Sequence, residues 1–196
     1  VAFQARFTLS FLGSDGGRMG EILVFILFRE LTPLLTALIV IARSVTAVSS
    51  ELATMTVQKE IEALEFIGID IGHYLLLPRI MAGVISLFSL SFCFWMISLA
   101  GSWVGVNWSS YWPLDRFFEV IAAALTPMDI IFFVIKGVVT GAVVFYWACR
   151  VGLSVRSASF EVPIVTNRAV VDALFLALGI QITLSAIFYL LFGVTL

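Results

Sequence analysis

The chain has 196 residues, of which 61% are hydrophobic and only 12% are charged, and its mean hydropathy is +1.11. Soluble domains contain roughly 45–50% apolar and roughly 25% charged residues, so this composition excludes an ordinary soluble domain and indicates an integral membrane protein. The formal net charge is −2 and the sequence has no basic tract. Nothing in the charge pattern therefore indicates a nucleic-acid partner.

Four apolar runs are long enough to cross a bilayer as helices. They cover approximately residues 21–42, 78–105, 130–149 and 169–196, and a hydrocarbon layer of about 30 Å requires about 20 helical residues. Residues 1–12 are also apolar but too short to span, and we interpret them as the end of a first span whose beginning is missing. We therefore expect residues 1–196 to form a single all-α transmembrane domain.

The first of these runs contains an adjacent Arg29–Glu30 pair followed by Pro33. A charged side chain at bilayer depth costs about 3 kcal/mol even on lenient insertion scales, so such a pair indicates a functional site that faces protein or water. A proline within a span frees a backbone carbonyl and bends or breaks the helix, which is tolerated where the backbone is buried or lines a cavity. The alternative is a span end, with both side chains reaching the interface.

Residues 56–68 form a polar segment between the first two runs. Its apolar residues Val57, Ile61 and Leu64 recur at helical spacing, glutamates fill the opposite face, and Gly68 is suited to end the helix. An acidic face is disfavoured on an anionic lipid surface. We therefore expect this short helix to dock into a groove on a partner protein. The alternative is that it packs against the protein's own cytoplasmic surface.

Positive charges favour one orientation of the spans. Six Lys and Arg residues flank the connections near 43–77 and 150–168, against three on the opposite side. The positive-inside bias places the side with more Lys and Arg residues in the cytoplasm, which puts the C-terminus outside. The connection near 106–129 carries an aromatic cluster suited to the outer interface, where Phe117 to Leu125 would form a short amphipathic helix.

Several catalytic patterns are absent from the sequence. There is no P-loop, so any ATP hydrolysis is expected on another subunit. His73 is the only histidine, and no group of Cys, His and carboxylate residues has metal-ligand spacing, so no metal site is expected. Cys93 and Cys149 lie within apolar runs and do not indicate a disulfide framework.

An ordered set of residues runs through the first half of the chain: Arg29-Glu30-Leu31, Pro33, Leu35-Thr36, Leu38, Arg43, Glu51-Leu52, Thr54-Met55, Glu60-Ile61, Ala63-Leu64, Gly68-Ile69-Asp70, Tyr74-Leu75 and Pro78-Arg79. This set resembles the pattern of the MlaE (YrbE) permease family, the membrane subunits of ABC systems that work with MCE-domain lipid-transfer proteins. Weaker likenesses, at Lys136-Gly137 and at Thr166 to Val171, lie at the last two runs.

The resemblance implies five transmembrane helices, the first largely missing here, and a cytoplasmic coupling helix at residues 56–68. It implies a homodimer in a bacterial inner membrane with a periplasmic C-terminus. The dimer would bind two ABC ATPase subunits, which would hold ATP and Mg²⁺, and a ring of MCE-domain proteins. No cofactor is expected in this chain. The cargo would be phospholipid, moved between the inner membrane and the MCE partner for outer-membrane lipid asymmetry or lipid trafficking; the alternative is sterol or another hydrophobic cargo.

The site hypothesis centres on Arg29, whose planar guanidinium matches phosphate oxygens. Glu30 would hold that guanidinium or switch partners between states. Lys136 is either a second cationic contact or a structural partner of Glu30 or Asp172. The acyl chains would lie against three leucines of the same span, Leu34, Leu35 and Leu38.

The contact with the ATPase would use four residues of the coupling helix, Glu60, Ile61, Leu64 and Gly68. Two other functional classes remain open. A membrane enzyme acting on lipid headgroups would use the Arg29–Glu30 pair in catalysis, but would also need a nucleophile or metal site that the sequence does not show. A membrane scaffold without transport activity would use the pair only to fix helix packing.

Overall fold

The structure is a computed structural model that describes residues 24–107, 113–155 and 158–192, and every regular element in these ranges is a helix. Four helices are long and apolar enough to cross a membrane: Leu27–Val57, Gly72–Gly105, Pro127–Gly152 and Glu161–Leu190. The expectation of an all-α membrane protein is therefore confirmed. Our interpretation of residues 1–12 lies outside the described ranges.

The first long helix is continuous through Pro33. It consists of a π-helical segment η1 (Val24–Leu31), α3 (Thr32–Val40), a second π-helical segment η2 (Ile41–Val45) and α4 (Thr46–Val57). Pro33 lies inside this rod, just after the junction of η1 and α3, and its missing N–H is preceded by the wider turns of η1. The break expected at the proline is instead a local change of helix type within one rod.

The next elements are α5 (Glu60–Phe66), η3 (Gly72–Leu76) and α6 (Leu77–Asn107). Most of the connection expected at 43–77 is therefore helical, because hydropathy marks the apolar part of a helix and not its ends. A helix of 31 residues such as α6 extends about 46 Å, which exceeds a hydrocarbon layer of about 30 Å.

The helix α5 lies between two residues with left-handed backbone conformation. Lys59, at φ 62°, ends α4, so α5 begins at Glu60 and is shorter than the expected helix over 56–68. Gly68, at φ 84°, follows the end of α5. The N–H of Gly68 bonds the carbonyl of Glu65, and the N–H of Ile69 bonds that of Leu64, which is the Schellman arrangement. The glycine therefore has the stop role expected from the sequence.

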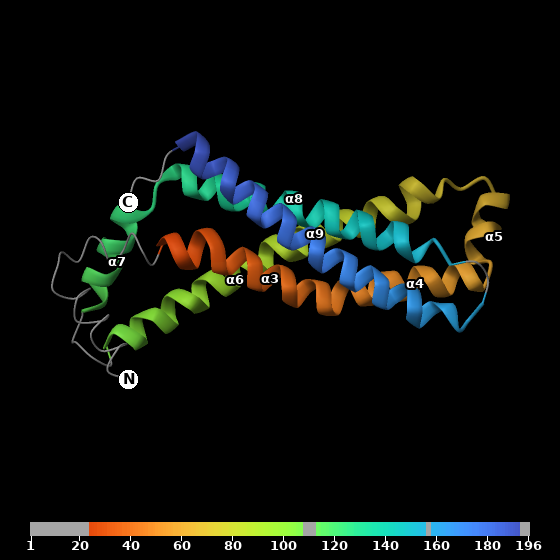
Figure 1. Ribbon diagram of the computed structural model, residues 1–196, viewed down its shortest axis with the longest axis horizontal. Helices are drawn as coiled ribbons and strands as arrows, with labels where there is room; N and C mark the ends of the chain where they lie inside the picture. Colours follow the sequence, from red (N-terminus) through yellow and green to blue (C-terminus); the bar gives the residue numbers. More distant parts are fainter. Residues whose placement is uncertain (1–23, 108–112, 156–157, 193–196) are drawn as a thin grey trace.

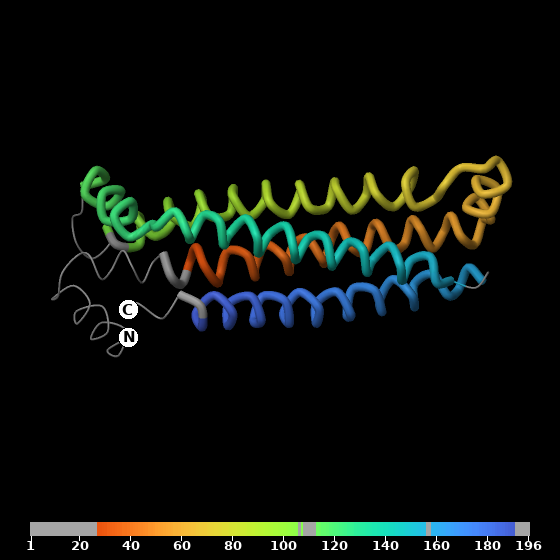
Figure 2. The backbone as a smooth tube through the Cα atoms, turned by 90° about the horizontal axis from the view of Figure 1, so that it is seen from above, coloured from red at the N-terminus to blue at the C-terminus, as the bar shows by residue number. Residues whose placement is uncertain are grey.

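The chain is completed by α7 (Leu114–Ala124), α8 (Pro127–Gly152) and α9 (Glu161–Phe192). The long helices lie side by side in an elongated bundle (Figures 1 and 2). The helix α5 lies at the same end as the end of α8 and the start of α9, whereas α7 crosses the opposite end (Figure 1). This arrangement agrees with the expectation that the connections near 43–77 and 150–168 share one side of the membrane.

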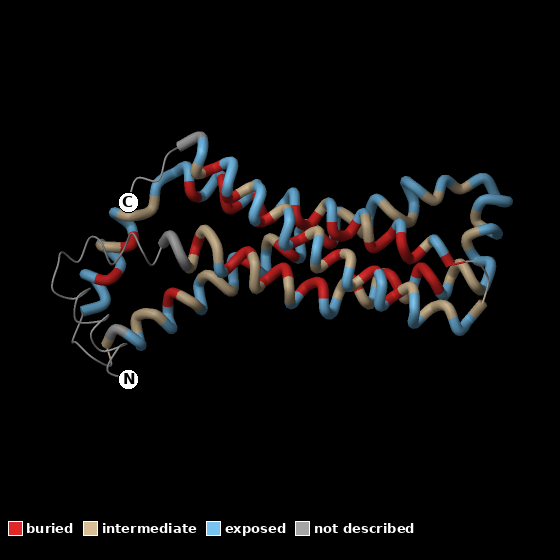
Figure 3. The backbone as a smooth tube through the Cα atoms, viewed as in Figure 1, coloured by how far each residue is buried: buried red, intermediate tan, exposed pale blue. Residues whose placement is uncertain are grey.

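Buried residues follow the inward faces of the long helices, whereas α5 carries none (Figure 3). The main cluster joins the first helix to α6, α8 and α9 and includes Ile41, Val45, Leu87 and Phe145. Small residues allow the closest approaches. A methyl group on Gly83 of α6 would overlap the ring of Phe145, so this glycine is required by the contact between α6 and α8.

We predict that Gly83→Ala lowers the unfolding temperature in detergent by roughly 2–10 °C, because overpacking of a core costs about 1–3 kcal/mol. The matched control is Gly101→Ala on the same helix, where an added methyl group meets nothing within 4 Å. The control is expected to be neutral or stabilising, since alanine favours helix over glycine. Equal unfolding temperatures for the two variants would contradict the described packing of α6 on α8.

Candidate functional site

Lys136 of α8 is fully buried, although lysine is almost never fully buried without a partner. Its Nζ atom donates to the carbonyl oxygen of Arg29 at 2.8 Å and to Oε2 of Glu30 at 3.2 Å. The Arg29 carbonyl lies four residues before Pro33, which has no N–H to donate to it. Lys136 therefore stabilises both the carbonyl opposite the proline and the adjacent carboxylate.

The Glu30 carboxylate connects three helices. In addition to Lys136 on α8, it accepts a hydrogen bond from the Tyr189 hydroxyl at 2.8 Å, and Ser185 Oγ lies 3.0 Å from its Oε2 atom. Tyr189 and Ser185 both belong to α9. The Glu30 side chain remains 36% exposed. Glu30 is thus held by the buried Lys136 and Ser185 and the half-buried Tyr189, and it remains partly accessible.

Arg29 forms its ion pair with Asp129 of α8, at 2.6 Å between Nη2 and Oδ1. Sequence reasoning paired Arg29 with Glu30 and did not identify Asp129. Asp129 is fully buried, and its Oδ2 atom also accepts hydrogen bonds from the backbone N–H and hydroxyl of Thr126. The order Thr126-Pro127-x-Asp129 is a readable helix-start signal, and it fixes the carboxylate at the level of Arg29.

The charged network of Arg29, Glu30, Asp129 and Lys136 contains two formal positive and two formal negative charges. The rings of Phe132 and Phe188 stack beside the network with centroids 4.2 Å apart. Lys136 Nζ lies 4.8 Å from the centre of the Phe132 ring, and Arg29 Cζ lies 5.4 Å from that of Phe188. The network is thus balanced in charge, and each of its two cations lies over an aromatic ring.

The sequence left two interpretations of the Arg29–Glu30 pair open, a functional site that faces protein or water and the end of a span. The position of the network has features of both. Asp129 lies in the first turn of α8, so Arg29 is level with the end of that helix. Lys136 lies about two turns further into the bundle. The Arg29 side chain is 21% exposed, whereas those of Asp129 and Lys136 are fully buried. The pair therefore lies near a helix end, but its partners are inside the protein.

The choice between partners of Lys136 is resolved in favour of Glu30. Asp172 lies elsewhere on α9, where it accepts a hydrogen bond from Trp147 Nε1 at 3.3 Å and lies 3.8 Å from Arg168 Nε. The three leucines expected to contact acyl chains, Leu34, Leu35 and Leu38, are half-buried on α3. They provide partly exposed apolar side chains on the same long helix as Arg29.

The residues expected to contact an ATPase lie at the other end of the bundle (Figure 1). Glu60 and Gly68 are exposed, and Ile61 and Leu64 are half-buried. Sequence reasoning did not single out two apolar residues that follow in the chain, Phe66 and Ile67, which are 90% and 75% exposed. Large apolar side chains exposed together indicate a contact surface.

One ion pair joins α6 to α4 near the α5 end of the bundle. Arg79 of α6 donates to Oε1 of Glu51 on α4 at 2.8 Å, and both residues belong to the ordered set that carries the family resemblance. Nearby, the Asp70 carboxylate contacts Nδ1 of His73 at 2.6 Å and accepts a hydrogen bond from the N–H of Gly72. The contact with His73 and the bond from Gly72 hold the pKa of Asp70 below its ordinary value.

Comparison with known proteins identifies similar chains. A family model described as the permease MlaE matches residues 1–187. The intermembrane phospholipid transport system permease protein MlaE of Haemophilus influenzae is 31% identical over 173 residues, covering 87% of this chain and 66% of that protein. The chloroplastic protein TRIGALACTOSYLDIACYLGLYCEROL 1 of Arabidopsis thaliana is 28% identical over 190 residues, covering 96% of this chain and 54% of that protein.

A probable ABC transporter permease protein of Rickettsia prowazekii is 30% identical over 175 residues, which is 87% of this chain and 66% of that protein. The chain thus spans between about half and about two thirds of the length of these relatives.

We predict that Lys136→Met lowers the unfolding temperature by roughly 5–20 °C, because removing one partner of a buried ion pair costs about 3–5 kcal/mol. The double variant Lys136→Met/Glu30→Gln should recover at least half of this loss, since no carboxylate is then left without its cation. Thermal unfolding in detergent measures both. Additive effects of the two single substitutions would contradict the direct pairing of Lys136 with Glu30.

Proposed function

Because this chain belongs to the MlaE permease family, we propose that it is the permease subunit of an ABC transporter that moves phospholipid between the inner membrane and an MCE-domain partner. A separate ATPase subunit would supply the energy. Two names among the relatives support this proposal: one refers to an intermembrane phospholipid transport system, and another to a probable ABC transporter permease.

The main support for this proposal is that Arg29 and Glu30 are partly exposed, whereas their partners Asp129 and Lys136 are fully buried. A guanidinium matches phosphate oxygens in shape and charge. In this proposal Arg29 contacts the lipid phosphate, while Asp129 and Lys136 position Arg29 and Glu30 from inside. The acyl chains lie along the half-buried leucines of α3.

Coupling to the ATPase would use the continuity of the first long helix. Residues from Val24 to Val57 form one rod, and α5 follows its end after two residues. Nucleotide-driven closure of ATPase subunits that hold Glu60, Ile61 and Leu64 would displace this rod, and with it Arg29 and Glu30.

The assembly proposed around this chain is a homodimer with two ATPase subunits at the α5 end and a ring of MCE-domain proteins at the α7 end. ATP and Mg²⁺ would be held by the ATPase subunits. The protein would cross a bacterial inner membrane several times, with its C-terminus in the periplasm. The positive charges flanking the α5 end support this orientation.

Three competing functions make different predictions. A membrane scaffold would use the charged network for packing alone, so its other activities would be unaffected by substitutions that keep the fold. A transporter of sterol or another uncharged lipid would not need the Arg29 guanidinium. A lipid-headgroup enzyme would turn over its lipid without an ATPase.

We predict that the double variant Arg29→Gln/Asp129→Asn loses phospholipid transfer at least tenfold while its unfolding temperature changes little. Removing both partners avoids leaving a buried, unpaired carboxylate. The comparison variant, Asp129→Asn alone, keeps the guanidinium but removes the carboxylate that positions it, so its transfer should lie between those of the wild type and the double variant. Transfer of labelled phospholipid from proteoliposomes containing the assembled transporter measures this effect.

Normal transfer by the double variant would remove Arg29 from the lipid site. Loss of transfer by Asp129→Asn to the same extent as by the double variant would show that the network, and not the guanidinium, is what transfer requires.

We also predict that Phe66→Ser/Ile67→Ser abolishes co-purification of the ATPase, while the unfolding temperature of the permease stays within about 2 °C. Both side chains are exposed, so their removal costs little within this chain. The control is Phe160→Ser, a 75% exposed aromatic residue at the same end of the bundle. Equal ATPase recovery with Phe66→Ser/Ile67→Ser and with Phe160→Ser would contradict the proposed docking surface.

A further inference from the structure

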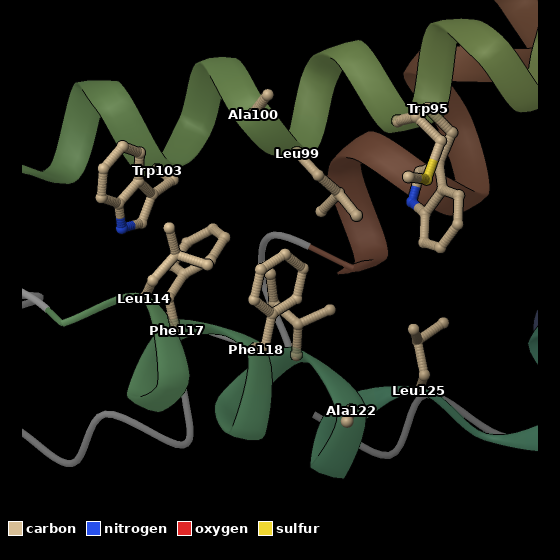
Figure 4. Close-up of a pocket in the computed structure, with 11 residues that line it drawn as sticks. Trp95, Leu99, Ala100, Trp103, Leu114, Phe117, Phe118, Ala122 and Leu125 are labelled. Carbon is tan, nitrogen blue, oxygen red and sulfur yellow. The ribbon is translucent and has the colours of Figure 1, made fainter.

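A groove lies between the last turns of α6 and the crossing helix α7. It has a volume of about 340 Å³, and its lining is almost entirely apolar. Figure 4 shows Trp95, Leu99 and Trp103 on α6 facing the side chains of α7. None of the lining residues belongs to the charged network. The groove is therefore a separate feature of the α7 end of the bundle.

The groove has a closed floor and an open rim. Leu99, Phe117 and Ile121 are almost completely buried and form part of one apolar cluster. On the rim, Met96 and Phe118 are 50% and 52% exposed. The helix Gly72–Gly105, which contains most of α6, is long and apolar enough to span a membrane, so the rim lies near the end of a candidate span. Tryptophans are enriched at this level of a membrane.

One polar group in the lining lacks a partner among the described residues. The indole Nε1 of Trp103 is buried and makes no hydrogen bond there. A buried N–H without an acceptor costs about 1–3 kcal/mol. The nitrogen lies on the side of the ring that faces α7 (Figure 4). An occupant that brought an acceptor oxygen to this end of the groove would remove that cost.

We infer that the groove binds one acyl chain of a membrane lipid, whose ester carbonyl accepts a hydrogen bond from Trp103 Nε1. An acyl chain matches the apolar lining, and its ester supplies a single acceptor at one end. The volume of about 340 Å³ is at the lower end of the range of about 300–1,000 Å³ found for small-molecule sites. This inference rests on the membrane placement of α6 and does not require the proposed transport.

A helix of another protein matches the groove less well than an acyl chain does. Its backbone N–H and C=O groups are paired within the helix, so its backbone offers no free acceptor to Trp103.

The test uses two neighbouring alanines of α7. Both are exposed, but only Ala122 lines the groove, whereas Ala123 does not. The full chain in mild detergent is titrated with phosphatidylcholine that carries dibrominated acyl chains, and quenching of tryptophan fluorescence is recorded. We expect saturable quenching in the wild type and in Ala123→Phe. Ala122→Phe fills the groove and should raise the half-quenching concentration at least tenfold.

A second variant removes the indole N–H and replaces the ring by a smaller aromatic ring, and Trp95 remains as a fluorophore in the groove. Trp103→Phe should raise the half-quenching concentration about three- to tenfold, the loss expected for one hydrogen bond. Quenching that is unsaturable, or that is the same in Ala122→Phe and Ala123→Phe, would overturn the inference. The inference would also be overturned if Ala122→Phe left lipid quenching unchanged but lost a membrane protein that co-purifies with the wild type. No ATPase or lipid transfer enters the readout, so failure here and failure of the proposed function are distinguishable.

Discussion

The burial of the Lys136 ammonium group is the constraint on which the site depends. In an apolar bundle a buried cation must be paired, and here it is bound by the Glu30 carboxylate and by the Arg29 carbonyl opposite Pro33. These contacts attach the first long helix to α8, and Glu30 extends the attachment to Tyr189 of α9. Lys136 and Glu30 together thus connect three helices at one level. The partly exposed side of Arg29 and Glu30 exists because the other side is saturated by buried partners.

The same rod carries the features proposed for lipid contact and for energy input. Arg29 and Glu30 lie near one end, and α4 runs to α5 at the other end (Figure 1). Close contacts such as Gly83 with Phe145 and the ion pair of Arg79 with Glu51 hold α6 against its neighbours. A displacement at α5 would therefore move a rigid element and not a flexible loop. This is the physical basis for proposing that an ATPase at one end controls charges at the other.

Sequence alone predicted the elements whose signal is local. Apolar runs predicted four long helices, and Gly68 predicted a helix stop because a left-handed residue favours glycine. It did not predict that Asp129 pairs with Arg29, or that α4 continues to Val57. The ion pair joins residues 100 positions apart, which no local pattern reports. The helix extension is polar on its exposed side, so hydropathy does not detect it. The sequence placed Ile67 close to the apolar stripe of the coupling helix, but it did not show that Phe66 and Ile67 are the most exposed apolar side chains there, because exposure depends on how the helix packs.

The central claim is that this chain moves phospholipid as the membrane subunit of an ATP-driven complex. Native mass spectrometry of the protein extracted gently from its own membrane tests it most directly. The account predicts a dimer of this chain that carries two ATPase chains, an MCE-domain assembly and bound phospholipid. A chain that is repeatedly recovered without an ATPase and without phospholipid would contradict the account and favour a scaffold.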